Sequence, residues 1–307
     1  MKNTQSKDLK YYVTKRSEKG TYKMRTHAMF YEKLKDKIHC FLCPHNCVIE
    51  NGQFGKCNVR TNDNGKLFTI NYGEVTSISL DPIEKKPLLY FRPNTQILSV
   101  GSYGCNFTCG FCQNYNISQS VVRSDFVPKE HLVQMIKTTK DNIGIAFTYN
   151  EPSIWYEYVY DCSRLLKETD KNAVVVLVTN GYISEEPLRE LLPYVDAMNI
   201  DLKSFSSVYY KDLCGGSLQP VLNTIQIAAK ACHVEITTLL VTGENDRLDE
   251  VGDIARFIST IDSRIPLHLT RYFPRYKLTK SPTDLDFMKK AGEVAEKYLN
   301  RVVLGNI

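Results

Sequence analysis

The sequence lacks the features typical of membrane, secreted and nucleic-acid-binding proteins. It has no run of 18 apolar residues, which excludes an ordinary membrane-spanning helix. Its first 20 residues are polar and basic without an apolar stretch, so we expect no secretory signal, and a cytoplasmic location. Basic residues exceed acidic ones by only 39 − 34 = 5, and they are dispersed. We therefore expect neither membrane nor nucleic acid as a partner.

The sequence also lacks internal repeats and low-complexity segments, and its composition is that of an ordinary globular protein. The 307 residues are 43% hydrophobic and 24% charged, which is enough for a sizeable core. We predict a polar tail over residues 1–25, either loose or forming a peripheral helix. A turn-rich, cysteine-rich accessory region follows over residues 26–95. The main domain is predicted to span residues 96–307.

From residue 97 onward, apolar runs typical of strands alternate with amphipathic stretches typical of helices. The predicted strands are residues 97–101, 143–148, 173–179, 197–202, 234–241 and 266–272. The predicted helices are residues 129–140, 153–168, 185–192, 218–231, 248–260 and 283–299. Six β-α units in a row favour a parallel sheet with right-handed crossovers. The pattern alone fits an open doubly wound sheet or an incomplete barrel, and both place functional residues at the carboxyl ends of strands.

The ten cysteines are unevenly distributed. Four fall within residues 40–57 and three within residues 105–112, while Cys162, Cys214 and Cys232 are scattered. Because a cytosolic chain of this size does not need disulfides for stability, clustered cysteines indicate metal binding.

The second group directly follows the first predicted strand. Cys105, Cys109 and Cys112 have the spacing C-x3-C-x2-C, with glycines at 101, 104 and 110 that let the backbone wrap closely. Three thiolates suit a cubane iron–sulfur cluster that keeps one iron without a protein ligand. They also suit a catalytic zinc with an open position.

With Phe111 at the aromatic position, this loop resembles the signature of the radical S-adenosylmethionine (SAM) superfamily. The resemblance implies an α/β fold, a partial (β/α)6 TIM-like barrel. It implies an enzyme with a [4Fe-4S] cluster on Cys105, Cys109 and Cys112 that cleaves SAM reductively. The resulting 5′-deoxyadenosyl radical would abstract hydrogen from a substrate. A low-potential electron donor such as ferredoxin or flavodoxin is implied as well.

Later strand ends carry residues that resemble SAM contacts of this superfamily. They are Asn150 and Glu151, Thr179 and Asn180, Asp201 and Lys203, and His268. By resemblance, Asn150 and Glu151 meet the amino group of the methionine, Lys203 pairs with its carboxylate, and His268 lies near the adenosine. Other interpretations remain open: Glu151 as a helix start, an exposed Asp201–Lys203 ion pair, and a structural His268. Val178 stands where related enzymes often carry an acidic residue.

The first group consists of Cys40, Cys43, Cys47 and Cys57, spaced C-x2-C-x3-C-x9-C. Four thiolates on such loops can hold a structural zinc or a second iron–sulfur cluster. The knuckle-like spacing favours zinc. His39 and His45 are spare candidate ligands.

The string from Cys40 to Arg60, the run from Asp81 to Lys86 and the second cysteine loop together sharpen the resemblance. They resemble radical SAM members of AmmeMemoRadiSam systems, in the pyruvate formate-lyase activating enzyme-related group. This resemblance implies MEMO-like and AMMECR1-like partners. It does not identify the substrate, and we expect either a small molecule or a partner protein. The alternatives are a glycyl-radical-enzyme activase and a non-catalytic zinc or iron–sulfur module that binds nucleic acid. The charged run 81–86 is either a solvated loop or a neighbour of the active site.

Overall fold

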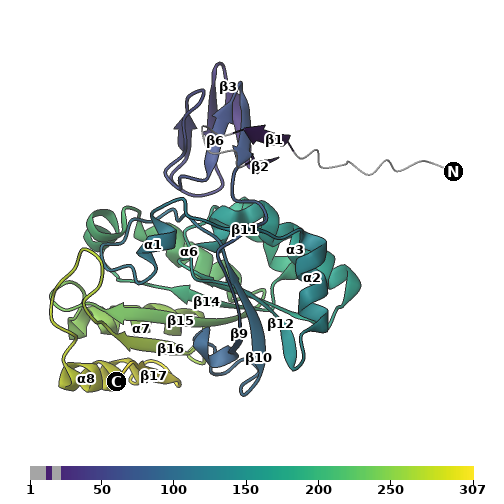
Figure 1. The fold of residues 1–307 in the computed structure, drawn as a ribbon. Helices are drawn as coiled ribbons and strands as arrows, with labels where there is room; N and C mark the ends of the chain where they lie inside the picture. Colours follow the sequence, from purple (N-terminus) through teal and green to yellow (C-terminus); the bar gives the residue numbers. More distant parts are fainter. Residues whose placement is uncertain (1–11, 16–21) are drawn as a thin grey trace.

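The computed structural model describes residues 12–15 and 22–307. Its largest sheet has eight strands in the order β17-β16-β15-β14-β13-β12-β10-β9 (Figure 1). The parallel strands are β10 (Gln96–Gly101), β12 (Asn142–Phe147), β13 (Val174–Thr179), β14 (Ala197–Asp201), β15 (His233–Leu240), β16 (Leu267–Arg271) and β17 (Val302–Gly305). The edge strand β9 (Ser77–Pro82) is antiparallel to β10. The six predicted strands are confirmed in their predicted order, whereas β9 and β17 were not predicted.

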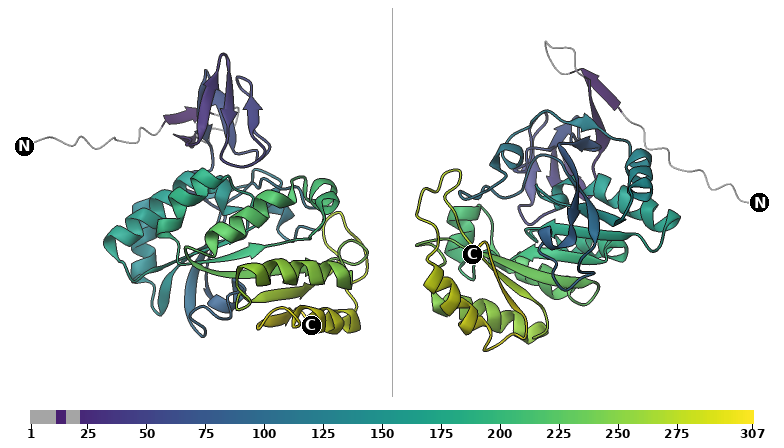
Figure 2. Two further views of the ribbon diagram at one scale, coloured as in Figure 1. Left: turned by 180° about the vertical axis from the view of Figure 1, so that it is seen from behind. Right: turned by 60° about the horizontal axis from the view of Figure 1, so that its bottom comes forward.

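Helices cover the outer face of this curved sheet (Figure 2). They are α2 (Lys129–Thr138), α3 (Tyr156–Thr169), α4 (Glu185–Leu191), α6 (Leu218–Ala228), α7 (Leu248–Ile261) and α8 (Leu285–Ala295). The prediction for the second of these ranges differs slightly, because a short 3₁₀ helix, η2 (Pro152–Trp155), precedes α3. Outward-facing strand residues such as Phe147 and Leu177 pack against apolar helix residues such as Val159 in the main core. This burial holds each β-α unit to the next.

A chain segment, and not a second layer of helices, fills the inner face of the sheet. Ile83 and Leu88 form a separate apolar cluster with strand residues such as Ala146 and Val176. The Leu89 and Tyr90 amides donate to the carboxylate of Glu235 on β15, at 3.1 and 2.8 Å. The sheet is therefore a partial barrel whose interior is plugged by residues after β9.

The charged run 81–86 spans the end of β9 and the start of this plug, and it is solvated only in part, since the Lys85 side chain is 67% exposed. Asp81 and Lys86 are 7% and 3% exposed. Lys86 Nζ donates to Asp81 Oδ2 at 2.9 Å, and the Tyr149 hydroxyl donates to the same oxygen at 2.9 Å. Because these groups pair with one another, the interior tolerates their charge.

Small antiparallel sheets make up the region before β9. One sheet has the order β1-β2-β7-β6, formed by β1 (Tyr12–Lys15), β2 (Tyr22–His27), β7 (Lys66–Thr69) and β6 (Arg60–Asp63). Another joins β3 (Tyr31–Leu34), β4 (Lys37–Cys40) and β5 (Cys47–Ile49). The expectation of a loose tail or helix is therefore wrong for residues 12–15 and 22–25, while residues 1–11 and 16–21 lie outside the described residues. The predicted boundary at residues 95 and 96 falls between β9 and β10, two neighbours in one sheet.

The cysteine-rich region sits on the barrel and is joined to it by buried polar contacts (Figure 1). Arg60 pairs with Glu157 of α3, and both side chains are nearly inaccessible to solvent. The indole Nε1 of Trp155 donates to the Asn71 carbonyl at 2.6 Å. Within residues 12–15 and 22–307, no helix has both the length and the apolar character needed to cross a membrane.

Candidate functional site

The loop between β10 and the short helix α1 (Tyr115–Ser118) carries Cys105, Cys109 and Cys112. Gly104 has a φ of +88°, and a Cβ there would lie 3.0 Å from the Cys57 carbonyl oxygen and 2.7 Å from Val59. This loop therefore needs glycine both for its backbone conformation and for its contact with the cysteine-rich region.

The sulfurs of Cys105 and Cys112 each have a hydrogen-bonding partner near them. The Phe107 amide donates to Cys105 Sγ at 3.4 Å, and Asn180 Nδ2 approaches the same sulfur at 3.7 Å. Cys112 Sγ and Ser118 Oγ lie 3.3 Å apart. Burial raises the pKa of the Cys105 thiol, and Glu151, Cys109 and Cys112 are close enough to affect it electrostatically.

These observations fit a cluster-binding loop. Thiol donors on one tight loop, with an amide and a hydroxyl directed at the sulfurs, form a donor set suited to an iron–sulfur cluster. Among the described residues, no three His, Cys, Asp or Glu side chains stand close enough to bind one metal ion as placed. The cluster loop is therefore defined by its backbone and its sulfur contacts.

Asn150 and Glu151, just after β12, hold this loop in position. Asn150 Oδ1 accepts from the Ser102 amide at 2.9 Å, and its Nδ2 donates to the Gly104 carbonyl at 3.2 Å. Glu151 accepts from the Ser153 amide, so it also caps η2 as the alternative interpretation expects. Both side chains are engaged within the protein.

Glu151 also joins the end of β12 to the end of β13. Its oxygens accept from the Thr179 hydroxyl at 2.7 Å and the Asn180 amide at 2.8 Å. Burial raises the pKa of Glu151, although these hydrogen bonds oppose the shift. Four of the predicted residues, Cys105, Glu151, Thr179 and Asn180, thus form one connected network.

Asp201 and Lys203 lie at the end of β14, on the Cys109 side of the loop. Their ion pair is 2.8 Å long, and the Lys203 side chain is 14% exposed. Lys203 Nζ lies 5.9 Å from the centre of the Phe111 ring. Burial lowers the pKa of Lys203, but Asp201 and the sulfurs of Cys109 and Cys214 raise it by more than burial lowers it. The net shift of this pKa is therefore upward. The Lys203 end of the pair is therefore largely buried, whereas the Asp201 side chain is 37% exposed.

His268 is buried on β16 and already has a strong partner. Its Nε2 lies 2.6 Å from Glu235 Oε2, and His233 Nε2 lies 3.0 Å from the other oxygen of the same carboxylate. Although burial raises the pKa of Glu235, the two histidines and the Tyr90 amide lower it to about 2. These contacts support the structural interpretation of His268, and its contact with adenosine stays a prediction. The sequence analysis missed Glu235. The feature that could have identified it is a charged carboxylate within an otherwise apolar predicted strand.

The first cysteine group surrounds a small cavity. Cys40, Cys43, Cys47 and Cys57 all line a space of about 10 Å³. Burial raises the pKa of Cys43 to about 12 and that of Cys57 to about 11. Arg60 Nη1 donates to Cys40 Sγ at 3.5 Å, which places a positive charge beside the four thiols.

The two spare histidines have other partners. His39 Nδ1 lies 2.8 Å from Glu32 Oε1 at the surface. His45 Nε2 lies 2.7 Å from the carbonyl of Asn106, the residue after Cys105. His45 therefore connects the first cysteine group to the cluster loop.

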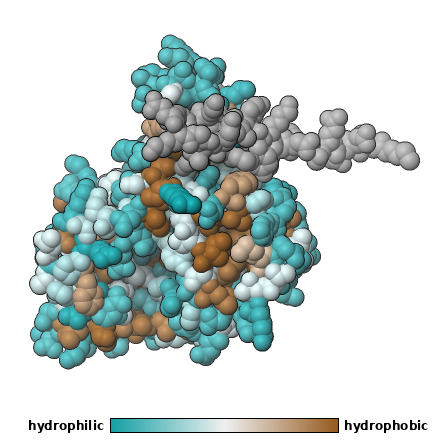
Figure 3. Space-filling view, in the orientation of Figure 1, coloured by the Kyte–Doolittle hydropathy of each residue, from teal (hydrophilic) through white to brown (hydrophobic). Residues whose placement is uncertain are grey.

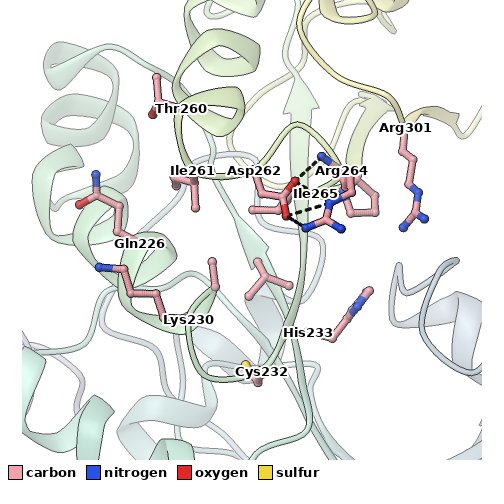
Figure 4. Close-up of a pocket in the computed structure, with 13 residues that line it drawn as sticks. Gln226, Lys230, Cys232, His233, Thr260, Ile261, Asp262, Arg264, Ile265 and Arg301 are labelled. Carbon is pink, nitrogen blue, oxygen red and sulfur yellow. Dashed lines mark hydrogen bonds and ion pairs between the residues drawn. The ribbon is translucent and has the colours of Figure 1, made fainter.

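A separate cavity of about 640 Å³ opens beside the amino ends of β15 and β16. Its lining includes Lys230, Cys232, His233 and Arg301, and Figure 4 shows Arg264 held by Asp262 at its rim. This cavity shares no residue with the predicted site. Most of that site lies at the carboxyl ends of the strands, whereas His268 is the second residue of β16 and therefore lies at an amino end.

Exposed apolar residues gather elsewhere. Figure 3 shows them in the middle of one face, where the edge strand β9 runs in Figure 1. Ile78 and Leu80 of β9 are 40% and 39% exposed. Neither Ile78 nor Leu80 is a predicted site residue.

Comparison with known proteins decides the family. The model of the radical SAM superfamily matches residues 99–258, just over half of the chain, and this stretch includes the cysteine loop. The chain belongs to the radical SAM superfamily. Members of this superfamily are generally enzymes, and membership implies a [4Fe-4S] cluster and SAM.

Two relatives of this radical SAM protein come from Methanocaldococcus jannaschii. The uncharacterized protein MJ0808 is 42% identical over 91% of this chain and 85% of its own length. MJ1632, named as a glycyl-radical enzyme activating enzyme, is 32% identical over 66% of this chain and 77% of its own length.

Solved structures share the fold of this radical SAM protein at low identity. A radical SAM methyltransferase from Sphaerobacter thermophilus aligns with a TM-score of 0.56 and 14% identity, covering 80% of this chain and 74% of that one. SuiB from Streptococcus suis, solved with SAM, aligns with a TM-score of 0.52 and 16% identity, covering 69% of this chain and 51% of that one. The predicted partial barrel is confirmed.

Proposed function

We propose that this protein is a radical SAM enzyme whose cluster is held by Cys105, Cys109 and Cys112. The observation that carries the proposal is the convergence of three strand ends on one loop. Asn150 after β12 bonds the backbone of the loop, Asn180 after β13 reaches Cys105, and Lys203 after β14 lies on the Cys109 side. Sequence motifs far apart in the chain therefore meet where the family places its cofactors.

The chain's own residues would hold and orient SAM beside the cluster. Lys203 supplies a largely buried positive charge for the methionine carboxylate, with Asp201 fixing its position. Glu151 supplies a buried negative charge for the amino group, oriented by Thr179 and Asn180. His268 is proposed for the adenosine side, and Phe111 shields the cluster with its ring, which is 5% exposed.

When bound, the cluster and SAM supply a 5′-deoxyadenosyl radical that abstracts hydrogen from the substrate. The protein contributes a closed environment for this chemistry. The segment after β16 covers the cluster loop, since the Lys277 amide donates to the Gly110 carbonyl at 2.9 Å. Tyr276 of the same segment stacks on Tyr115 of α1, with ring centres 4.4 Å apart. Both contacts hold this segment against the loop.

The substrate we favour is a residue of a partner protein. The named activity of MJ1632 supports this choice, and it keeps a glycyl-radical-enzyme activase as the second candidate function. The sequence resemblance adds MEMO-like and AMMECR1-like proteins as proposed partners, with a ferredoxin or flavodoxin as electron donor. Membership in the superfamily favours these enzyme readings over a non-catalytic module.

The first cysteine group is proposed to hold one structural zinc ion and not a second cluster. The cavity that its four thiols line has a volume of about 10 Å³, which leaves room for one small occupant. Arg60, which is 1% exposed, would offset the negative charge of a tetrathiolate site. Through His45 and Gly104 such a site would brace the cluster loop.

Reductive cleavage of SAM tests the proposed reaction. Anaerobically reconstituted protein, given SAM and dithionite, is expected to release 5′-deoxyadenosine, measured by chromatography. Cys105→Ala should abolish this release, because the cluster loses a ligand. Cys232→Ala, in the distant cavity, is the matched control and should leave it intact. Release by Cys105→Ala at the control rate would contradict the proposal.

Metal content tests the proposed zinc site separately. Wild-type protein should hold about one zinc per chain, by the four-thiolate stoichiometry of structural sites. Cys43→Ser combined with Cys57→Ser should lose it, whereas Cys105→Ala should keep it. Iron in place of zinc, retained in Cys105→Ala, would show a second cluster instead.

A further inference from the structure

Cys214 is a buried cysteine that the proposed reaction does not use. It ends a short π-helix, η4 (Tyr210–Cys214), which follows β14 and the short helix α5 (Ser207–Tyr209). Its exposed fraction is 0%. Because the sequence places it about 100 residues from the cysteine loop, no spacing rule connects it with that loop.

The backbone around Cys214 is joined to the cluster loop on both sides of Cys109. The Thr108 amide donates to the Cys214 carbonyl at 2.8 Å, and the Gly110 amide donates to the Leu213 carbonyl at 3.2 Å. Two hydrogen bonds that flank one cysteine fix its distance from the facing chain. Cys109 and Cys214 are therefore held opposite each other.

The two glycines after Cys214 allow this close approach. A Cβ on Gly215 would lie 2.6 Å from Thr108 Oγ1, and one on Gly216 would lie 2.3 Å from the Phe107 ring. Gly215 also has a φ of +76°. The sequence Cys214-Gly215-Gly216 is thus shaped to pack tightly on the cluster loop.

The side chains of the two cysteines also lie close enough to influence each other. Cys109 raises the pKa of Cys214, and Cys214 lowers the pKa of Cys109. A cysteine sulfur that ligates iron carries no proton, so the only S–H in such a pair belongs to Cys214. Once Cys109 is a ligand, Cys214 can only donate.

We propose that Cys214 is a positioning residue for the cluster: its thiol donates a hydrogen bond to the ligating sulfur of Cys109 and raises the reduction potential of the cluster. This inference rests on the proposed function. Hydrogen bonds to cluster sulfurs stabilise the more negative, reduced state, and they are one of the means by which proteins set these potentials. Cys214 therefore makes the one-electron reduction by a low-potential donor easier.

An EPR-monitored redox titration of reconstituted protein tests this role. Cys214→Ala should move the midpoint potential of the cluster to a more negative value while iron content stays equal to wild type. Cys214→Ser keeps a donor and should fall between the two. Cys232→Ala, another cysteine with no contact to the loop among the described residues, should match wild type. An unchanged midpoint in Cys214→Ala, or an equal shift in the serine variant, would overturn the role.

A second measurement does not depend on the size of the shift. In protein exchanged into D₂O, pulsed EPR of the reduced cluster should detect a strongly coupled deuteron that is missing in Cys214→Ala. Loss of iron in Cys214→Ala would instead identify Cys214 as a ligand and would also overturn the proposal. If wild-type protein forms no cluster or leaves SAM intact, the proposed function fails. If wild type is active and Cys214→Ala titrates as wild type, only this inference fails.

Discussion

Glu157→Gln should strongly destabilise the junction between the cysteine-rich region and the barrel. Glu157 Oε1 accepts from Arg60 and from the Met29 amide, the latter at 2.8 Å. The glutamine keeps size and an acceptor but removes the charge, which leaves the Arg60 guanidinium buried without its carboxylate. Removing one partner of such a pair costs about 3–5 kcal/mol, and the retained acceptor places this variant near about 3 kcal/mol.

Urea unfolding provides the measurement, with fluorescence from Trp155, the single tryptophan, which lies at this junction. The free energy of unfolding comes from linear extrapolation with the slope unchanged. Glu168→Gln, on the same helix, is the matched control. Its pair with Arg164 is solvent-exposed, so its loss should stay below about 0.5 kcal/mol.

The two variants are compared at equal metal content, because a charged metal site next to Arg60 would change the cost. Combining Arg60→Met with Glu157→Gln should cost less than the sum of the single changes, since no charge is then left unpaired. A Glu157→Gln protein as stable as the Glu168→Gln control would refute the reasoning.

Two further predictions concern the barrel. Since the pKa of Glu235 falls from 4.5 to about 2 on folding, its ionised form contributes stability that is complete above the ordinary pKa and is lost as pH falls toward 2. That contribution is about 3 kcal/mol. Urea unfolding at several pH values tests it: between about pH 5 and about pH 3, Glu235→Gln should lose less of its free energy of unfolding than wild type does. If the free energy of unfolding falls equally with pH in both proteins, the depressed pKa is contradicted. Gly144→Ala puts a Cβ 1.9 Å from the Val174 carbonyl oxygen, between paired strands that cannot move apart. It should cost more than about 3 kcal/mol or yield insoluble protein, whereas soluble protein with wild-type stability would contradict the strand register.

The barrel strands were predictable because each is a buried apolar run bounded by polar residues. The strand β9 was missed although Ser77-Ile-Ser-Leu80 alternates, because it belongs to the barrel sheet as an antiparallel edge and precedes the first β-α unit. The strand β17 was missed because its run of four residues follows the last predicted helix. Hydrophobic pattern identifies a strand but not its partner.

The candidate site was predictable where residues are close in sequence and unpredictable where the fold brings them together. The spacing of Cys105, Cys109 and Cys112 indicated one cluster loop directly. The role of Glu235 as the partner of His268 and of two plug amides rests on contacts across 33 to 146 residues. The same holds for Cys214, whose facing loop lies a hundred residues earlier. Such contacts follow from strand order, which a single sequence does not specify.

The measurement that most directly tests the central claim is EPR of reduced, reconstituted protein with and without SAM. It compares wild type with a variant in which Cys105, Cys109 and Cys112 are all alanine. Wild type should show a [4Fe-4S]⁺ signal that changes shape when SAM is added, because one iron has no protein ligand. The triple variant should lose this SAM-responsive signal. A triple variant that keeps it would show that the cluster is held elsewhere in the chain.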